Sequence, residues 1–216
     1  MLKTRSPIGS SITIGSRTIW LLATLLITIL SAGCASVGDQ RVEVLYQRSV
    51  HASGGSGDLY IVEEAPPPTG GTSTIQWVIG EIRNKDGEKL GNTVTDTAPM
   101  DILMTAYTQE FKSAGYNTVQ LNTMPPGTAK GMVLKSATVK VDEVKSPTNL
   151  EVKTKVTVSV EPWRDGRALT KTEYEADYTE SAVTGRDALA SKALLQAIQT
   201  IMKRSVPDIV KTIEQK

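Results

Sequence analysis

The chain has 216 residues, with 24 lysines and arginines against 23 aspartates and glutamates, and 39% of its residues are hydrophobic. A near-neutral chain of this length without a basic cluster fits one ordinary domain and argues against nucleic acid as a partner. Its single cysteine excludes an internal disulfide, and its single histidine argues against a transition-metal site.

Residues 1–33 have the organisation of an export signal. Lys3, Arg5 and Arg17 precede the segment 19–30, which is apolar except for two threonines. A helix that spans a bilayer needs about 20 apolar residues, whereas a run of about 7 to 15 behind positive charge is typical of a secretory signal. We therefore expect residues 1–33 to be removed and to take no part in the fold.

Three small residues, Ser31, Ala32 and Gly33, lead directly into Cys34, the only cysteine. Small side chains suit the extended backbone of a peptidase substrate, which predicts cleavage between Gly33 and Cys34. This arrangement resembles the lipobox of bacterial lipoproteins, although Leu30 stands four residues before the cysteine and the family usually has leucine three before. The resemblance implies a covalent diacylglycerol on Cys34 and an N-acyl chain, such as palmitate, on its new amino group.

Two other roles for Cys34 are a buried structural cysteine and a reactive thiol. No neighbouring base or cation would lower the pKa of the thiol, and lipid attachment is favoured. Each buried methylene contributes about 0.8 kcal/mol, so that two or three acyl chains would hold the protein stably on a membrane without spanning it.

Residues 34–74 are predicted to form a lipidated tether with two short strands, 41–46 and 58–64. Whether these strands join the main sheet is left open by the sequence. The loop 51–57 contains His51 among glycines and serines, and we expect a solvated histidine there. The segment 65–73 combines consecutive prolines with glycines, which predicts a spacer that lets the domain reach a partner.

Residues 75–216 are predicted to form an α+β domain. A strand at 75–84 and a turn at 84–92 precede a helix of about 16 residues that starts after Thr97 and ends at Gly115. A short strand follows near Val119. Clean alternation at 137–142, 150–160 and 172–178 predicts three antiparallel strands with one charged face.

The final helix is expected from about 185 to 213, with a capping box between Thr184 and Asp187 and a kink or a second short helix at Pro207. Together these elements predict a two-layer sandwich, with a mostly antiparallel sheet of 4–6 strands and two helices on one face.

The segments 79-IGEIRNKDGEKLGN-92, 109-QEFKSAGY-116 and 174-YEADYTESAVTGRDA-188 resemble the YajG-like lipoproteins, and more loosely the auxiliary lipoproteins of envelope ABC transport systems. The resemblance covers about residues 75–210 and implies a non-enzymatic lipoprotein of the bacterial outer membrane, on its periplasmic face. Ala35 agrees with outer-membrane sorting, because an aspartate at this position retains such proteins at the inner membrane in some bacteria.

The sequence offers few candidates for chemistry. Asp86 and Glu88 lie in a turn without the ligand spacing of a calcium loop, and no catalytic or metal-binding residues are identified. Glu110 and Glu143 are interpreted as solvated surface charges, and Trp77 as a core residue. Candidate partner contacts are Trp163, at a hairpin end, and the residues Asn84, Asp86 and Glu88 of the loop 84–98.

These observations predict a lipid-anchored, non-catalytic binding or assembly module of the cell envelope. Its partner would be an envelope protein, or a second copy bound through an open sheet edge. Alternatives are a periplasmic small-ligand or lipid-binding protein and an auxiliary component of an envelope ABC transport system. An enzyme would need a convergent polar site.

Overall fold

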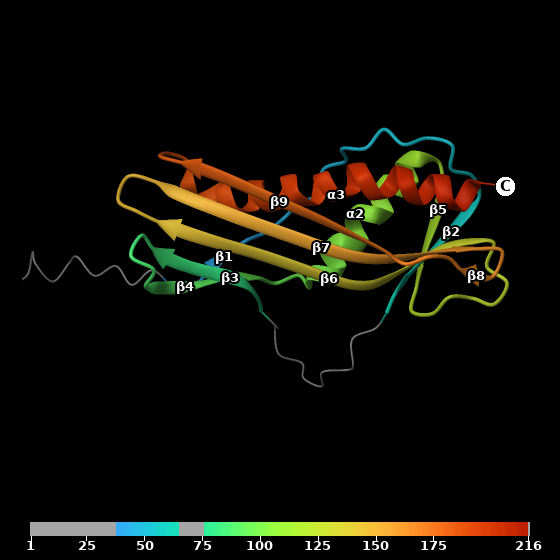
Figure 1. Cartoon of the computed structure of the whole chain (residues 1–216), viewed down its shortest axis with the longest axis horizontal. Coiled ribbons are helices and arrows are strands. Elements are labelled where there is room, and N and C mark those ends of the chain that lie inside the picture. The colour runs from blue at the N-terminus through green and yellow to red at the C-terminus, as the bar shows by residue number, and fades with distance from the viewer. Residues whose placement is uncertain (1–37, 65–75, 216) are drawn as a thin grey trace, which may run out of the picture. The chain divides into compact units, whose positions relative to one another are not determined.

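Two long strands with alternating apolar residues carry the sheet. The computed structural model describes residues 38–64 and 76–215 (Figure 1). The described strands are β1 (Gln40–Arg41), β2 (Asp58–Glu63), β3 (Trp77–Asn84), β4 (Lys89–Thr95), β5 (Asn117–Leu121), β6 (Lys130–Lys145), β7 (Leu150–Arg164), β8 (Arg167–Ala168) and β9 (Thr172–Ala182). The described helices are α2 (Pro99–Ala114), the short turn η1 (Arg186–Ala188) and α3 (Leu189–Glu214).

The nine strands form one mixed sheet, in which β6 pairs with β7 along one side. The other side of β6 is shared, because β2 pairs with Gly131–Leu134 and β3 pairs with Glu143–Lys145, both in parallel. β5 extends the sheet beyond β2, β4 and β1 extend it beyond β3, and β9 and β8 pair with β7. The α+β class is confirmed, but the sheet is larger than the expected 4–6 strands and has four parallel pairings.

The alternation of apolar residues gives the sheet one apolar face, and the helices pack on this face. α3 packs on β7 and β9, α2 packs on β6, β2 and β5, and the two helices contact each other on the same face of the sheet (Figure 1). Tyr107 of α2 is fully buried, and its hydroxyl donates to Ser205 Oγ of α3 over 2.9 Å. Burial of each large apolar side chain contributes about 1.5–3 kcal/mol, so this layer of helix against sheet is the main source of stability.

Helix α2 ends as expected and begins differently. It has 16 residues, and Gly115 follows it with φ 110°, a left-handed conformation that favours glycine. The predicted cap at Thr97 is wrong, because Ala98 occupies the N-cap position and no side chain caps the helix. The Thr97 amide instead donates to Thr95 Oγ1 over 3.3 Å.

Helix α3 is one continuous element through Pro207, so of the two alternatives expected there, a kink or a second short helix, the second short helix is wrong. Gly185 precedes η1, and neither η1 nor α3 has a side-chain cap, which excludes the predicted capping box. The apolar stripe of α3 is buried over its whole length, from Leu189 to Ile213. This burial holds the helix together where Pro207 removes one backbone donor.

The folded unit begins at Gly38, well before the expected domain boundary at residue 75. β2 lies inside the sheet between β5 and β6, and β1 pairs with β4, which answers the question left open by the sequence. Between them, the segment 43–57 runs across the helices (Figure 1). Gln199 of α3 donates to the carbonyl of Gln47 in this segment over 2.9 Å.

The expected loop at 84–98 contains strand β4, which runs from Lys89 to Thr95. β3 approaches β6 closely at Gly80, where an added Cβ would lie 1.8 Å from the carbonyl oxygen of Val141. The first residues of β3 pair with β4 alone, since pairing with β6 begins at Ile82. Trp77 is therefore 38% exposed, and its predicted core position is wrong.

In the described part of the chain, no helix is long and apolar enough to cross a membrane. Cys34, Gly33 and the segment 65–73 lie outside the described residues.

Candidate functional site

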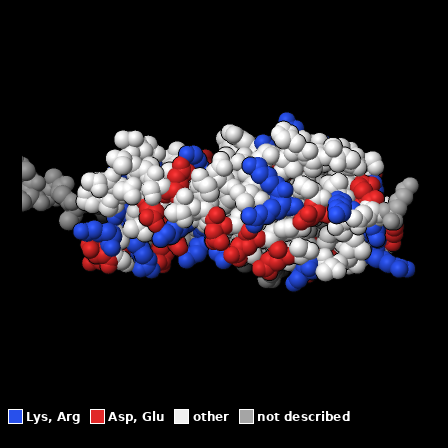
Figure 2. Space-filling model, turned by 45° about the horizontal axis from the view of Figure 1, so that its top comes forward, with Lys and Arg blue, Asp and Glu red and all other residues white. Residues whose placement is uncertain are grey.

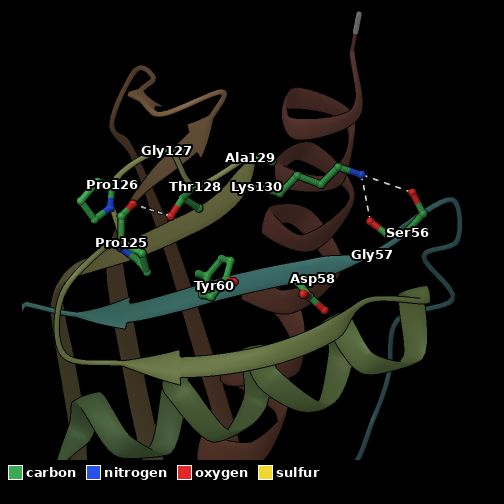
Figure 3. A pocket seen from close by; sticks show the side chains of 10 residues that line it. All are labelled: Ser56, Gly57, Asp58, Tyr60, Pro125, Pro126, Gly127, Thr128, Ala129 and Lys130. Atoms are coloured by element: carbon green, nitrogen blue, oxygen red, sulfur yellow. Dashed lines mark hydrogen bonds between the residues drawn. The ribbon is translucent and has the colours of Figure 1, made fainter.

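A pocket of about 530 Å³ lies at the end of the sheet where β2 and β6 begin (Figure 3). One wall is apolar, formed by Tyr60 of β2 and by Pro125 and Pro126 of the loop between β5 and β6. The other lining residues are Ser56, Gly57, Asp58, Gly127, Thr128, Ala129 and Lys130. We call this the distal pocket.

The loop that carries the proline wall is held by hydrogen bonds to its backbone carbonyls. Thr128 Oγ1 donates to the carbonyl of Pro125 over 2.6 Å, and Gly127 adopts a left-handed φ of 72°. The turn between β7 and β8 braces the loop from the other side, because the amides of Asp165 and Gly166 donate to Ala129 and Thr128 over 2.9 and 2.8 Å. The proline wall is thus preformed, which lowers the entropic cost of binding a ligand.

Two charged residues, Asp58 and Lys130, line the distal pocket, and the ammonium of Lys130 is fully engaged. Lys130 Nζ donates to both carboxylate oxygens of Glu214 over 2.7 and 2.8 Å. It also contacts the carbonyl oxygen and Oγ of Ser56 over 2.9 and 3.2 Å (Figure 3). Because Lys130 acts as a donor in each contact, this pair of Ser56 and Lys130 is not arranged as a nucleophile with its base.

Tyr116 completes this cluster between the sheet and the end of α3. Its hydroxyl donates to Glu214 Oε1 over 2.8 Å, and Lys130 Nζ lies 5.8 Å from the centre of its ring. Burial raises the pKa of the Glu214 carboxyl, but the hydrogen bonds from Lys130 and Tyr116 outweigh this effect and lower the pKa overall. The cluster joins the C-terminal end of α3 to β6.

Asp58, on the polar side of the pocket, also has a hydrogen-bond partner within the protein. Asn117 Nδ2 donates to Asp58 Oδ1 over 2.7 Å, across the parallel pair of β2 and β5. The distal pocket therefore offers an apolar wall with a polar rim, which suits recognition of a small ligand or an extended chain. Among the described residues, no group of three or more histidine, cysteine or acidic side chains could hold a metal ion.

Two glutamates that the sequence placed on the surface are buried. Glu110 of α2 is 1% exposed and accepts hydrogen bonds from the Tyr46 hydroxyl and from the amides of Ser49 and Val50, the amide of Ser49 over 2.7 Å. Its carboxylate fixes the segment 43–57 to the helix. The predicted solvated position of Glu110 is wrong, because it lies on the same helix face as Ala106 and Tyr107.

Glu143 of β6 is fully buried on the face that carries Val139 and Val141. Neither carboxylate oxygen has a hydrogen-bond partner, and Lys145 Nζ lies 3.7 Å from Oε2. Burial raises the pKa of the Glu143 carboxyl, and Lys145 opposes this in part. The predicted surface position of Glu143 is also wrong.

The four predicted contact residues do not form one surface. Asn84, Asp86 and Glu88 belong to the turn between β3 and β4, in which Asn84 Oδ1 accepts from the amides of Asp86 and Glu88, each over 2.9 Å. Trp163 is half-buried on β7, and its Nε1 donates to Glu161 Oε1 over 3.0 Å. Asn84 pairs with Lys145 and Trp163 with Gly131, so about 46 Å of strand β6 separates the two places.

His51 is exposed in the segment 43–57, beside Pro207 and two lysines of α3. Sequence reasoning missed the distal pocket entirely. The pattern 124-MPPG-127 indicated only a break between strands, and nothing local shows that this break lies over β2.

No family model matches the chain, and no curated protein matches it. The chain is also similar to several solved structures. A Xanthomonas campestris protein of the DUF330 family is 11% identical with a TM-score of 0.47, over 81% of this chain and 95% of that one. A minor lipoprotein from Acinetobacter baumannii is 11% identical with a TM-score of 0.32, over 72% and 86% of the two chains.

A third, uncharacterised protein is 7% identical with a TM-score of 0.32, over 82% of this chain and 98% of that one. None of these three names mentions the YajG-like family, which stays a prediction. At such identities and TM-scores, the function of this chain has to be inferred from its own residues.

Proposed function

We propose that the protein is a lipoprotein of the bacterial outer membrane, anchored through acyl chains on Cys34 and facing the periplasm. The observation that carries the proposal is the position of the only cysteine, directly behind an export segment and four residues before the folded unit starts at Gly38. The unit from Gly38 onward contains no cysteine, so the thiol is placed where an anchor would be needed.

Its role in this proposal is recognition without catalysis, as a binding or assembly module. The support comes from the distal pocket, in which Asp58 and Lys130 are satisfied by neighbouring side chains. An edge strand offers a second surface, since no described strand pairs with the outer edge of β9. Arg204 donates to the carbonyl of Glu175 on β9 over 3.3 Å, which covers one backbone acceptor of that edge.

The anchor is tested by the intact mass of the protein extracted from bacterial membranes, beside a Cys34→Ser variant. The expected mass corresponds to a chain that begins at Cys34 with a diacylglycerol and an N-acyl chain added. The serine variant should lack these groups and leave the membrane fraction. An unmodified chain, soluble in both forms, would contradict the proposal.

A small-ligand role is favoured by one observation, the preformed proline wall of the distal pocket. A native mass spectrum of gently extracted protein should then show an additional mass that disappears on delipidation. Pro126→Arg, which fills the pocket, should remove that mass, whereas Thr138→Arg on the exposed face of β6 should leave it. If the spectrum contains the acylated chain alone, the assembly role stands by itself.

A further inference from the structure

The described chain is fixed to the sheet from its second residue onward. Asp39 Oδ1 accepts from the amide and the Nδ2 of Asn92 over 2.8 and 3.0 Å. Gln40 and Arg41 then pair in parallel with β4, and the amide of Val42 donates to Val94 over 2.8 Å. Val42 is 1% exposed. The chain is therefore held to the sheet directly after Gly38, so that only the residues from Cys34 to Gly38 can set the distance between the anchor and the fold.

This connection leaves the fold at one end of the sheet. Lys145 Nζ, at the end of β6, donates to Gln40 Oε1 over 3.0 Å. Arg186 donates to the carbonyls of Ser146 and Pro147 over 3.4 and 3.3 Å, which places the start of α3 at the same end. We call this the proximal end, formed by residues 38–40, 85–88, 145–149 and 183–187; it lies on the left in Figure 1.

The distal pocket lies at the opposite end of the same strand. Lys130 opens β6 and Lys145 closes it, and 16 residues of strand span about 50 Å. By contrast, the four residues from Cys34 to Gly38 reach at most about 14 Å, even when fully extended. The anchor can thus hold the proximal end at a lipid surface, and it cannot reach the distal pocket.

We propose that the proximal end faces the phospholipid headgroups and that the distal pocket points away from the membrane. This orientation rests on the proposed acylation of Cys34. The proximal end carries three basic residues and four acidic ones, so that attraction to anionic lipids does not drive the contact. Figure 2 shows the same mixture of signs at the left of the molecule.

An apolar residue at this end suits the lipid boundary. Val183, in the connection from β9 to α3, is 68% exposed. The outer face of the sheet is less suited, because lysines and acidic residues form ion pairs across it, such as Lys155 with Glu175 over 2.7 Å and Lys153 with Glu151 over 2.9 Å. A protein that lies flat on this face would have to disturb the hydration of these pairs.

Two variants of the full chain, each with one cysteine added to Cys34, test the orientation. Asp86→Cys places a thiol on the turn between β3 and β4 at the proximal end, and Arg167→Cys places one on β8, next to the start of β6; both positions are exposed. Acylation blocks the sulfur of Cys34, so a maleimide fluorophore labels the new thiol alone. Each labelled protein is reconstituted into phosphatidylcholine vesicles that contain a lipid with a nitroxide on its headgroup.

Quenching should be several-fold stronger at position 86 than at position 167, and high salt should leave this difference unchanged. Equal quenching at both positions would show a protein that lies flat and would overturn the orientation. Intact mass separates this result from failure of the anchor, because an acylated chain with equal quenching contradicts the orientation alone. A chain without acyl groups would contradict both proposals.

Discussion

The buried Glu143 predicts a variant that is more stable than the natural protein. Its two carboxylate oxygens lack hydrogen bonds, and the nearest cation, Lys145 Nζ, is 3.7 Å away. A buried polar group without a partner costs about 1–3 kcal/mol, and more when it is charged. Glu143→Gln keeps the size of the side chain and removes the charge whose burial raises the pKa, so it should raise the free energy of unfolding at pH 8 by about 1.4 kcal/mol for each pH unit by which that pKa is raised.

The gain should depend on pH in a defined direction. Burial raises the pKa of Glu143 above its usual value of 4.5, so the folded protein binds this proton more tightly than the unfolded chain. The natural protein therefore becomes more stable as pH falls from the folded pKa to below 4.5, whereas the glutamine variant does not gain from this site. The difference between them should shrink toward zero near pH 4.

Urea unfolding of the unacylated chain from Ala35 onward measures both effects, with the fluorescence of Trp77 and Trp163 as the signal. The matched control is Glu110→Gln, at a carboxylate that accepts from Tyr46 and from two backbone amides. That variant should lose about 1–3 kcal/mol, because a glutamine NH₂ would face donors. A loss of stability in Glu143→Gln at pH 8, or a gain that is independent of pH, would refute the reasoning.

Two further predictions concern contacts of β6. Gly80→Ala should lower the free energy of unfolding by about 1–3 kcal/mol, because the new Cβ would meet the carbonyl oxygen of Val141 at 1.8 Å. Gly38→Ala, with open space around it, is the control and should be neutral in the same urea titration. Lys130→Met should cost about 1–3 kcal/mol at pH 7 through loss of the contact with Glu214. Since the pKa of Glu214 is lowered, this cost should disappear as pH falls through that pKa, and a cost that persists in acid would show that packing of the lysine stem matters more.

The positions of both buried glutamates could have been predicted from the sequence. Alternation that places Val139 and Val141 inward continues to Glu143, and Glu110 follows Tyr107 at the three-residue spacing of the apolar helix face. Both glutamates were interpreted as surface charges because acidic side chains are rarely buried, although the periodicity placed them on the apolar face. The sequence does not show why a buried Glu110 is tolerated. The reason is that the segment 43–57 packs against the helix and donates hydrogen bonds to the carboxylate.

Local pattern predicted the hairpins, the C-terminal end of α2 and the approximate position of α3, because these features depend on neighbours in the chain. The parallel pairings were missed, since they join segments far apart in sequence. The run 59-LYIV-62 is a continuous apolar stretch, and β2 lies inside the sheet, with β5 on one edge and β6 on the other. The distal pocket depends on these same distant pairings, and for this reason no motif indicated it.

The order of segments limits how far the protein can reach from a membrane. A spacer at 65–73 was expected to separate the anchor from the domain, but β2 precedes this segment and already lies inside the sheet. The segment connects β2 to β3 and adds nothing to the tether, which under the proposed anchoring is the chain from Cys34 to Gly38. A partner of the proximal end must then lie at the membrane surface, whereas a partner of the distal pocket must reach a point about 50 Å further along β6. The reach of the protein would come from the length of its rigid strands and not from a flexible linker.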